Sequence, residues 1–379
     1  MRKTFRGIKL LAVVLGIFPS GAFAATTYGA TAPSAIATPQ VVQQASSQAS
    51  SLLAGRISQA VSGAVGNISG ASISVPTPGG FGGGVPGGGV PSGGVPSGGS
   101  TGPRSEITGG NAKAAGDPVK DTALWMNAGN AWVENDQAGV NFKGSIQTAL
   151  IGVDHMFDDK MLLGVAAGYE HPNISTKFNS GSLRGNNLAL SPYAAYIIND
   201  IFSVNVVGGY TWVNYNTTRS SGAIQGAING GRMFGNVNFT ATKRYSDWSL
   251  ASTAGYMYLL EKQNPYTETG VGGVANQKND IRLGQVRWTN KLGYSVNQEW
   301  GSFTPYGSVR LEYDSSHTPT GVADTRGTPI SNDRFGATFG LGVDAAIGDD
   351  VTLSVEGTST EFREHLISRG VNGTVRLKF

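Results

Sequence analysis

The chain ends on the stretch Gly370–Phe379, GVNGTVRLKF, in which apolar and polar residues alternate. One face carries Val371, Gly373, Val375, Leu377 and Phe379, and the other carries Asn372, Thr374, Arg376 and Lys378. Since side chains along a β-strand point alternately to its two faces, the stretch predicts a strand with one apolar and one polar face. An apolar edge strand promotes aggregation unless it closes a barrel. We therefore predict that this strand closes a membrane-spanning β-barrel.

The composition argues against several other classes of protein. The 379 residues include no Cys, which excludes a disulfide framework and thiolate metal sites. The formal net charge of +3 gives no case for binding nucleic acid. The mean hydropathy of −0.12 is too polar for a membrane protein built from helices.

Residues 1–24 have the pattern of a secretory signal peptide. The basic segment Met1–Lys9 precedes a short apolar core, Leu10–Phe18, and the small residues of Ala22-Phe23-Ala24 follow. We expect export and cleavage after Ala24. No later run reaches the ~18 apolar residues that a transmembrane helix needs.

The region between the signal and the barrel divides into two parts. Residues 25–66 are expected to form a disordered start and a short helix, because apolar residues recur at steps of three and four between Gln40 and Val65. This helix could be a spacer, lie inside the barrel lumen or form a short coiled-coil seam. Residues 67–120 are rich in Gly, Pro and Ser, which predicts a flexible linker.

Residues 121–379 alternate between strand-like stretches and turns. Short turns are predicted at 157–160, 198–200, 245–247, 298–301 and 348–350, and longer loops at 134–139, 172–185, 217–231, 263–280, 314–332 and 362–368. Eleven connections join twelve strands. Short turns at one rim and longer loops at the other are typical of outer-membrane barrels. We therefore predict an all-β membrane protein, a twelve-stranded antiparallel outer-membrane β-barrel preceded by the short helix and the Gly/Pro-rich linker.

Aromatic residues indicate that the apolar face of the strands meets lipid rather than a soluble core. They gather near the short turns (Phe157, Phe202, Trp248, Phe303, Phe379) and near the long loops (Trp132, Tyr169, Tyr210, Trp212, Tyr258, Tyr313). Two such belts favour a membrane barrel over a soluble β-sandwich or β-helix.

The polar face then lines the lumen. Its charged candidates are Arg287, Lys291, Arg310, Glu312, Asp344, Glu356, Arg376 and Lys378. They could form a solvated, mutually paired wall, or they could hold a helix or polypeptide in the pore.

Several blocks of this region, taken in order, are similar to a known family. They are LLGVAAGYE at Leu162–Glu170, LSPYAAYI at Leu190–Ile197, VVGGYTW at Val206–Trp212, FTPYGSVRLEY at Phe303–Tyr313 and the terminal strand. Together they resemble the C-terminal β-domain of autotransporters, the type V secretion proteins. The resemblance implies a helix through the lumen, a passenger outside a Gram-negative-type cell and a barrel-assembly signal at Val375, Leu377 and Phe379. It also implies contact with outer-membrane lipid and lipopolysaccharide, barrel-assembly machinery and periplasmic chaperones. We expect a monomeric barrel.

The chain departs from the family pattern in three places. The family's helix directly precedes the first strand, where this chain has the short, Gly-containing segment Gly109–Lys120. Little or no passenger is expected before the barrel, since no β-helix repeats occur there. The insertion signal usually has Gly five positions before the final aromatic, where Thr374 stands and Gly373 precedes it.

No motif in the sequence supports catalysis. The four histidines (His155, His171, His317, His365) are isolated, so we expect no metal, no cofactor and no enzymatic activity, including that of an outer-membrane phospholipase. The leading hypothesis is a barrel that anchors or translocates its own short N-terminal segment to the cell surface. The alternative is a stand-alone outer-membrane barrel that serves as a pore or a surface or structural protein.

Overall fold

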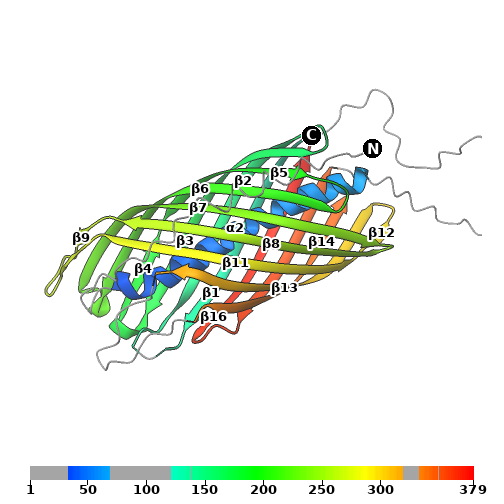
Figure 1. Ribbon diagram of the computed structural model, residues 1–379. Coiled ribbons are helices and arrows are strands. Elements are labelled where there is room, and N and C mark those ends of the chain that lie inside the picture. Colours follow the sequence, from blue (N-terminus) through cyan, green and yellow to red (C-terminus); the bar gives the residue numbers. More distant parts are fainter. Residues whose placement is uncertain (1–32, 69–120, 138, 319–332, 349) are drawn as a thin grey trace, which may run out of the picture.

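The computed structural model describes residues 33–68, 121–137, 139–318, 333–348 and 350–379. These residues form a closed antiparallel barrel with one helix, α2 (Pro33–Ile68), running through it (Figure 1). Predictions for the signal peptide, residues 25–32 and 69–120 lie outside the described residues.

The wall has twelve strands, as the sequence predicts. Two of them are interrupted, so that β4 and β5 follow each other in one strand and β11 and β12 in another. The elements are β1 (Thr122–Asn135), β2 (Phe142–Phe157), β3 (Met161–Thr176), β4 (Gly181–Gly185), β5 (Asn187–Ile197), β6 (Phe202–Arg219), β7 (Ile224–Tyr245), β8 (Trp248–Gln263), β11 (Asn279–Tyr294), β12 (Val296–Gln298), β13 (Gly301–His317), β14 (Phe335–Ile347), β15 (Val351–Glu361) and β16 (Leu366–Lys378). A small ribbon of β9 (Tyr266–Thr267) and β10 (Ala275–Asn276) belongs to a long loop.

The last strand closes the barrel. β16 pairs along its length with β1, and Leu377 lies opposite Leu124. The Phe379 backbone N–H donates to the Thr122 carbonyl oxygen at 3.0 Å. On the outer face of this strand, Val371, Val375 and Leu377 are each more than 40% exposed, which gives the wall its lipid-compatible surface.

Two of the predicted loops are largely strand in the structure. In place of loops 172–185 and 217–231, β3 continues to Thr176 and β6 to Arg219, and each is joined to the next strand by a single 3₁₀ turn. β7 has 22 residues, about twice the ~9–11 that a strand needs to cross a bilayer. The wall on this side therefore extends well beyond the membrane at the long-loop end.

The extension shows a reversed polarity, which explains why the sequence pattern there did not predict a strand. Along β6 the outward residues Phe202, Val206, Tyr210 and Trp212 are apolar, and the outward residues that follow, Asn214 and Asn216, are polar. The inward residues change from Ser203 and Asn205 to Val213 and Tyr215. Beyond the bilayer the outer face meets water, so the apolar residues turn to the inside.

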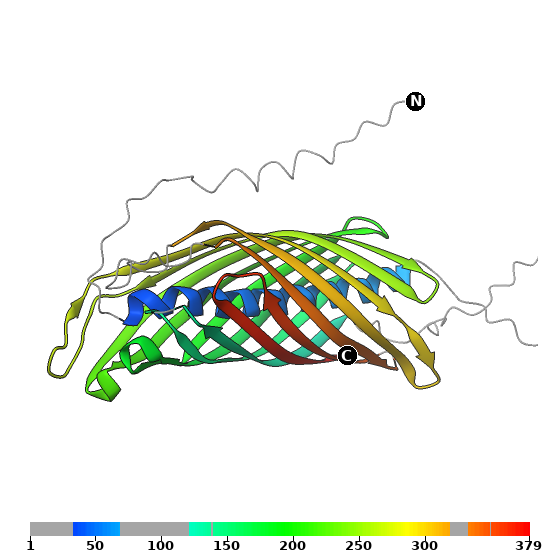
Figure 2. The ribbon, with the colours of Figure 1, turned by 90° about the horizontal axis from the view of Figure 1, so that it is seen from below.

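The helix is longer than the predicted 40–65 and lies inside the barrel (Figure 2). Among the described helical residues, Val42 and Leu53 are at most 1% exposed. Val42 packs with wall residues of the long-loop end and Ile57 with Leu162 and Ile197 near the short turns. The helix thus begins at the long-loop end and runs toward the short-turn end. Of the three interpretations, the structure supports the helix in the lumen.

Within the described ranges, no helix combines the length and the apolar character that crossing a membrane requires.

Candidate functional site

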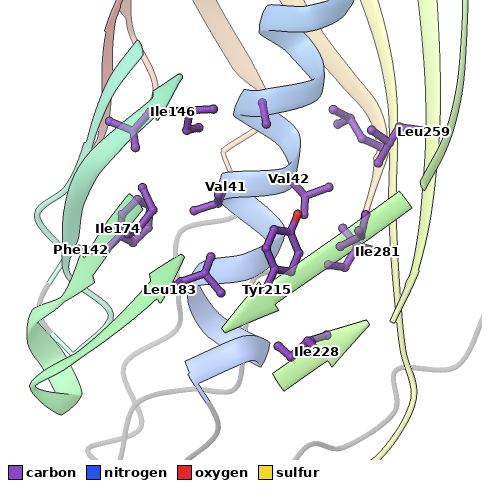
Figure 3. Close-up of a cluster of buried hydrophobic side chains, with 14 of the residues drawn as sticks. Val41, Val42, Phe142, Ile146, Ile174, Leu183, Tyr215, Ile228, Leu259 and Ile281 are labelled. Atoms are coloured by element: carbon purple, nitrogen blue, oxygen red, sulfur yellow. The ribbon is translucent and has the colours of Figure 1, made fainter. Parts of the chain in front are cut away.

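At the long-loop end an apolar collar surrounds the start of the helix (Figure 3). Val41, Val42 and Ala45 of α2 are at most 1% exposed there. The wall contributes Val133, Phe142, Ile146, Ile174, Leu183, Val213, Tyr215, Ile228, Met257, Leu259, Ile281, Leu283 and Leu366, from β1, β2, β3, β4, β6, β7, β8, β11 and β16. We call these residues the apolar collar. Fully burying one such side chain is worth about 1.5–3 kcal/mol, so the collar holds the outer part of the helix firmly.

Beside the collar, on β13, an ionic cluster takes the place of apolar residues. Arg363, from the turn between β15 and β16, donates to Asp314 at 2.9 Å and to Glu312 at 3.3 Å. Arg310 donates from Nε to the same Glu312 at 2.6 Å. Burial alone would lower the pKa of the Arg363 guanidinium, but its hydrogen bonds to Asp314 and the two carboxylate charges raise that pKa above its usual value. The cluster is therefore charged and internally paired.

A second ionic cluster lies within the wall next to the collar. The Arg232 guanidinium donates to Glu170 at 2.9 Å, to Glu261 at 2.8 Å and to the Tyr215 hydroxyl oxygen at 2.7 Å. Arg232 is 2% exposed and Glu261 is 0% exposed. Removing one member would leave an uncompensated buried charge, which makes this cluster a structural tie between β3, β6, β7 and β8.

Toward the short-turn end the helix lies against one side of the wall only. Leu53, Ile57, Ala60 and Val61 pack on an apolar group that includes Trp125 and Tyr193, from β1, β2, β3, β5 and β6. A cavity of about 470 Å³ lies between the rest of the helix surface and residues of β1, β6, β7, β8, β11 and β13 to β16. Its lining includes Asn236, Asn238 and Thr253, and we call it the polar cavity.

Hydrogen bonds join the middle of the helix to the wall. The Ser50 hydroxyl oxygen accepts from the Asn236 amide at 2.9 Å and from Arg287 at 3.3 Å. The Ser51 hydroxyl oxygen accepts from Arg310 at 2.8 Å. Near the helix start, the Gln40 side-chain oxygen accepts from the Asn135 amide at 3.0 Å.

The charged residues singled out from the sequence divide into two groups. Arg287 and Arg310 contact the helix, and Glu312 supports Arg310. The others pair with the wall: Lys291 with Asp344 at 2.8 Å, Glu356 with the Ser308 hydroxyl at 3.3 Å, and Arg376 with Asp154. Lys378 is half-buried at the short-turn rim.

Toward the short-turn end, Arg56 of the helix lies near the side chains that surround the Arg376–Asp154 ion pair. The Arg56 guanidinium lies 5.8 Å from the centre of the Trp125 ring and is buried. Trp125 donates to the Tyr193 hydroxyl oxygen at 2.7 Å, and that hydroxyl donates to Asp154 at 3.1 Å. Arg56, the one charged residue between Pro33 and Ile68, therefore packs against an aromatic ring.

Sequence reasoning missed Ser50, Ser51, Arg232 and Arg363. Arg232 directly follows the predicted loop 217–231 and Arg363 lies inside the predicted loop 362–368, so neither was assigned to the lumen. The two serines have no distinguishing pattern in a helix rich in Ala and Ser. Apolar residues inside the predicted loops, namely Ile174, Leu183, Ile228 and Leu366, were a signal that could have placed part of the collar.

The residues of the expected assembly signal share the outer face of the closing strand. Val375 is 45%, Leu377 44% and Phe379 63% exposed. The aromatic residues of the two belts are exposed in the same way, apart from Tyr258, which is half-buried. The part of these three residues in assembly stays a prediction.

No group of three or more metal-ligating side chains occurs in the part of the chain that the structure describes. His155 contacts the Thr122 hydroxyl at 2.8 Å and His365 contacts Asp136 at 2.8 Å, so each serves a local contact at a strand end.

The family model of the autotransporter β-domain matches residues 124–358. The chain belongs to the autotransporter β-domain family. A comparison with curated proteins found no match. The predicted family is thus confirmed, and with it an outer-membrane barrel of the Gram-negative autotransporter type, which is a translocation domain and not an enzyme.

Solved autotransporter β-domains share the fold. The translocator domain of the autotransporter NalP from Neisseria meningitidis is 16% identical with a TM-score of 0.59, over 69% of this chain and 89% of that domain. The β-domain of the Bordetella autotransporter BrkA is 15% identical with a TM-score of 0.52, over 68% of this chain and 100% of that domain. These similarities confirm the predicted twelve-stranded barrel.

Proposed function

We propose that this autotransporter barrel brings its own N-terminal segment into the lumen, retains α2 there as a plug and displays the residues before Pro33 at the cell surface. The observation that carries the proposal is the direction of the helix. Its first half passes through the apolar collar at the long-loop end with Val41, Val42 and Ala45, and long loops face outside in barrels of this kind.

The hydrogen bonds to the helix support retention rather than complete passage. Arg287 and Arg310 donate to Ser50 and Ser51, while the collar encloses Val42. A stand-alone open pore is less well supported, because α2 occupies the lumen and the collar packs against it at the long-loop end.

The remaining expectations from the sequence belong to the same proposal. Residues 1–24 direct export and are removed after Ala24, which mass measurement of the mature protein would test. The barrel inserts with the help of the barrel-assembly machinery and periplasmic chaperones, and remains monomeric among outer-membrane lipid and lipopolysaccharide.

Protease shaving of intact cells tests surface display. A cleavable tag near Thr27 should be cut from outside. A tag in the turn after Tyr245 is the negative control, and one beside the 99%-exposed Val271 in the loop of β9 and β10 is the positive control. If the tag near Thr27 resists cleavage while the tag near Val271 is removed, the proposal fails and the pore or structural function gains.

A further inference from the structure

We propose that the apolar collar alone is the permeability barrier of this barrel, and that the polar cavity is a water-filled vestibule that favours small inorganic anions. The inference requires only that the helix lies in the lumen, so it is independent of whether residues before Pro33 reach the cell surface.

The barrier is assigned to the collar because its apolar contacts enclose the helix. Val41, Val42 and Ala45 belong to one buried apolar cluster with side chains from nine of the described strand segments, among them Phe142 of β2 and Ile228 of β7. β13, β14 and β15 contribute no described residue to the collar, and on this side Arg363, from the turn between β15 and β16, pairs with Glu312 and Asp314 of β13. Hydrophobic constrictions close pores by excluding water, so this level resists hydrated ions without any moving part.

The helix cannot act as a barrier at the level of the polar cavity. Leu53 and Ile57 contact one side of the wall, and the space of about 470 Å³ on the other side is far larger than one water molecule needs. Ser249, Ser295 and Thr352, close to the short turns, belong to its lining, so the cavity extends toward that rim. Water and ions from the periplasm therefore reach the level of the arginines.

The charge of the lining favours anions. Among the described residues it includes five cationic side chains (Arg56, Arg244, Arg287, Lys291, Arg310) and two anionic ones (Asp344, Glu356). Lys291 pairs with Asp344 and Arg310 with Glu312, which is 4% exposed. Asp154 acts electrostatically on Arg56, and Glu312 and Asp314 act on Arg287, so these two cations are compensated in part. The lining still carries more cationic than anionic side chains, and Arg244 adds to this excess. A charged lining of one sign selects ions of the other.

Single-channel recording of the purified full chain in planar bilayers under a KCl gradient tests both halves of the proposal. Val42→Asn introduces a polar group into the collar, and Leu53→Asn does the same in an equally buried part of the helix outside it. We expect a raised conductance for Val42→Asn and the wild-type current for Leu53→Asn. Ile228→Ser, in the wall of the collar, should also raise it, so the result does not depend on the helix variant alone.

The reversal potential of the opened variant reports its selectivity. In Val42→Asn it should shift toward the chloride equilibrium potential, and a second change, Arg244→Glu, should reduce that shift. Lys262→Glu is the matched control, since Lys262 is exposed on the outer face of β8 and not part of the cavity lining. Heat-modifiable mobility on gels confirms that each variant is folded.

Three results would overturn the inference. Folded Val42→Asn and Ile228→Ser proteins with wild-type current would show that the collar is not the barrier. An equal rise for Leu53→Asn would place the barrier along the whole helix. Cation selectivity of the opened variants would contradict the proposal that the polar cavity favours anions.

Discussion

The two halves of the lumen hold the same helix in different ways. At the long-loop end, Val41 and Val42 are enclosed by the collar. At the short-turn end, Leu53 and Ile57 are equally apolar but rest on one side of the wall beside a cavity of about 470 Å³. The helix is apolar in both places, so the difference comes from the wall.

The wall differs because its outer face meets different solvents. Within the bilayer, strands place apolar residues outward and leave polar residues for the lumen. Beyond it, the outer face meets water and the apolar residues turn inward, as Val213 and Tyr215 do on β6. A dry seal is thus built from the part of the barrel that lies outside the membrane.

The largest expected effect concerns closure, on which both halves depend. Phe379→Ser should strongly lower the fraction of assembled barrel, because it removes the exposed aromatic at the short-turn end of the closing strand. Ile367→Ser, at the long-loop end of the same strand and 43% exposed, should lower it less. Heat-modifiable mobility on gels measures the assembled fraction. Equal losses for both variants would remove the special role of the terminus.

Arg232→Ala should destabilise the long-loop half by about 3–5 kcal/mol, because it leaves Glu170 and Glu261 buried without their cation. Arg244 lies on the same strand, β7, but is exposed at its short-turn end. Arg244→Ala should therefore change the free energy of unfolding by no more than about 0.5 kcal/mol. Urea unfolding in detergent gives both values. If both substitutions change the free energy of unfolding by a similarly small amount, water must reach Glu170 and Glu261 in the long-loop half.

Thiol labelling compares the two halves directly, since the chain has no Cys of its own. Gly55→Cys should react readily with a small hydrophilic maleimide, because Gly55 lines the polar cavity and a Cβ there meets nothing within 4 Å. Ala45→Cys should stay unreacted, since Ala45 is 0% exposed in the collar. Rapid labelling at both positions would contradict a dry collar.

The smallest expected effect is at the serines of the helix. Ser51→Ala removes the hydrogen bond from Arg310 and should ease release of α2 by about 1 kcal/mol. Ser46→Ala should cost nothing, because the buried Ser46 hydroxyl has no hydrogen-bond partner among the described residues. The urea concentration at which Ala45→Cys becomes labelled reports release. A larger shift for Ser46→Ala would argue against the serine contacts.

Much of this architecture is predictable from the sequence, and its limits have a physical cause. Alternation with an apolar outer face identified the barrel and the closing strand Gly370–Phe379. The same rule misassigned 172–185 and 217–231 as loops, because polarity reverses once a strand leaves the membrane. The sequence did not decide whether α2 lies in the lumen. A helix of small residues has no pattern that identifies the surface it packs against, so the wall residues must be known first.

Because polarity is reversed in the extension, substitutions on its outer face and substitutions on its inner face have different consequences. Asn214 faces outward and its neighbour Tyr215 inward, and the same holds for Asn229 and Ile228. Because consecutive residues of a strand point to opposite faces, the outward, water-facing surface can vary without altering the seal one residue away. A single sheet thus permits diversification on one side and requires constancy on the other.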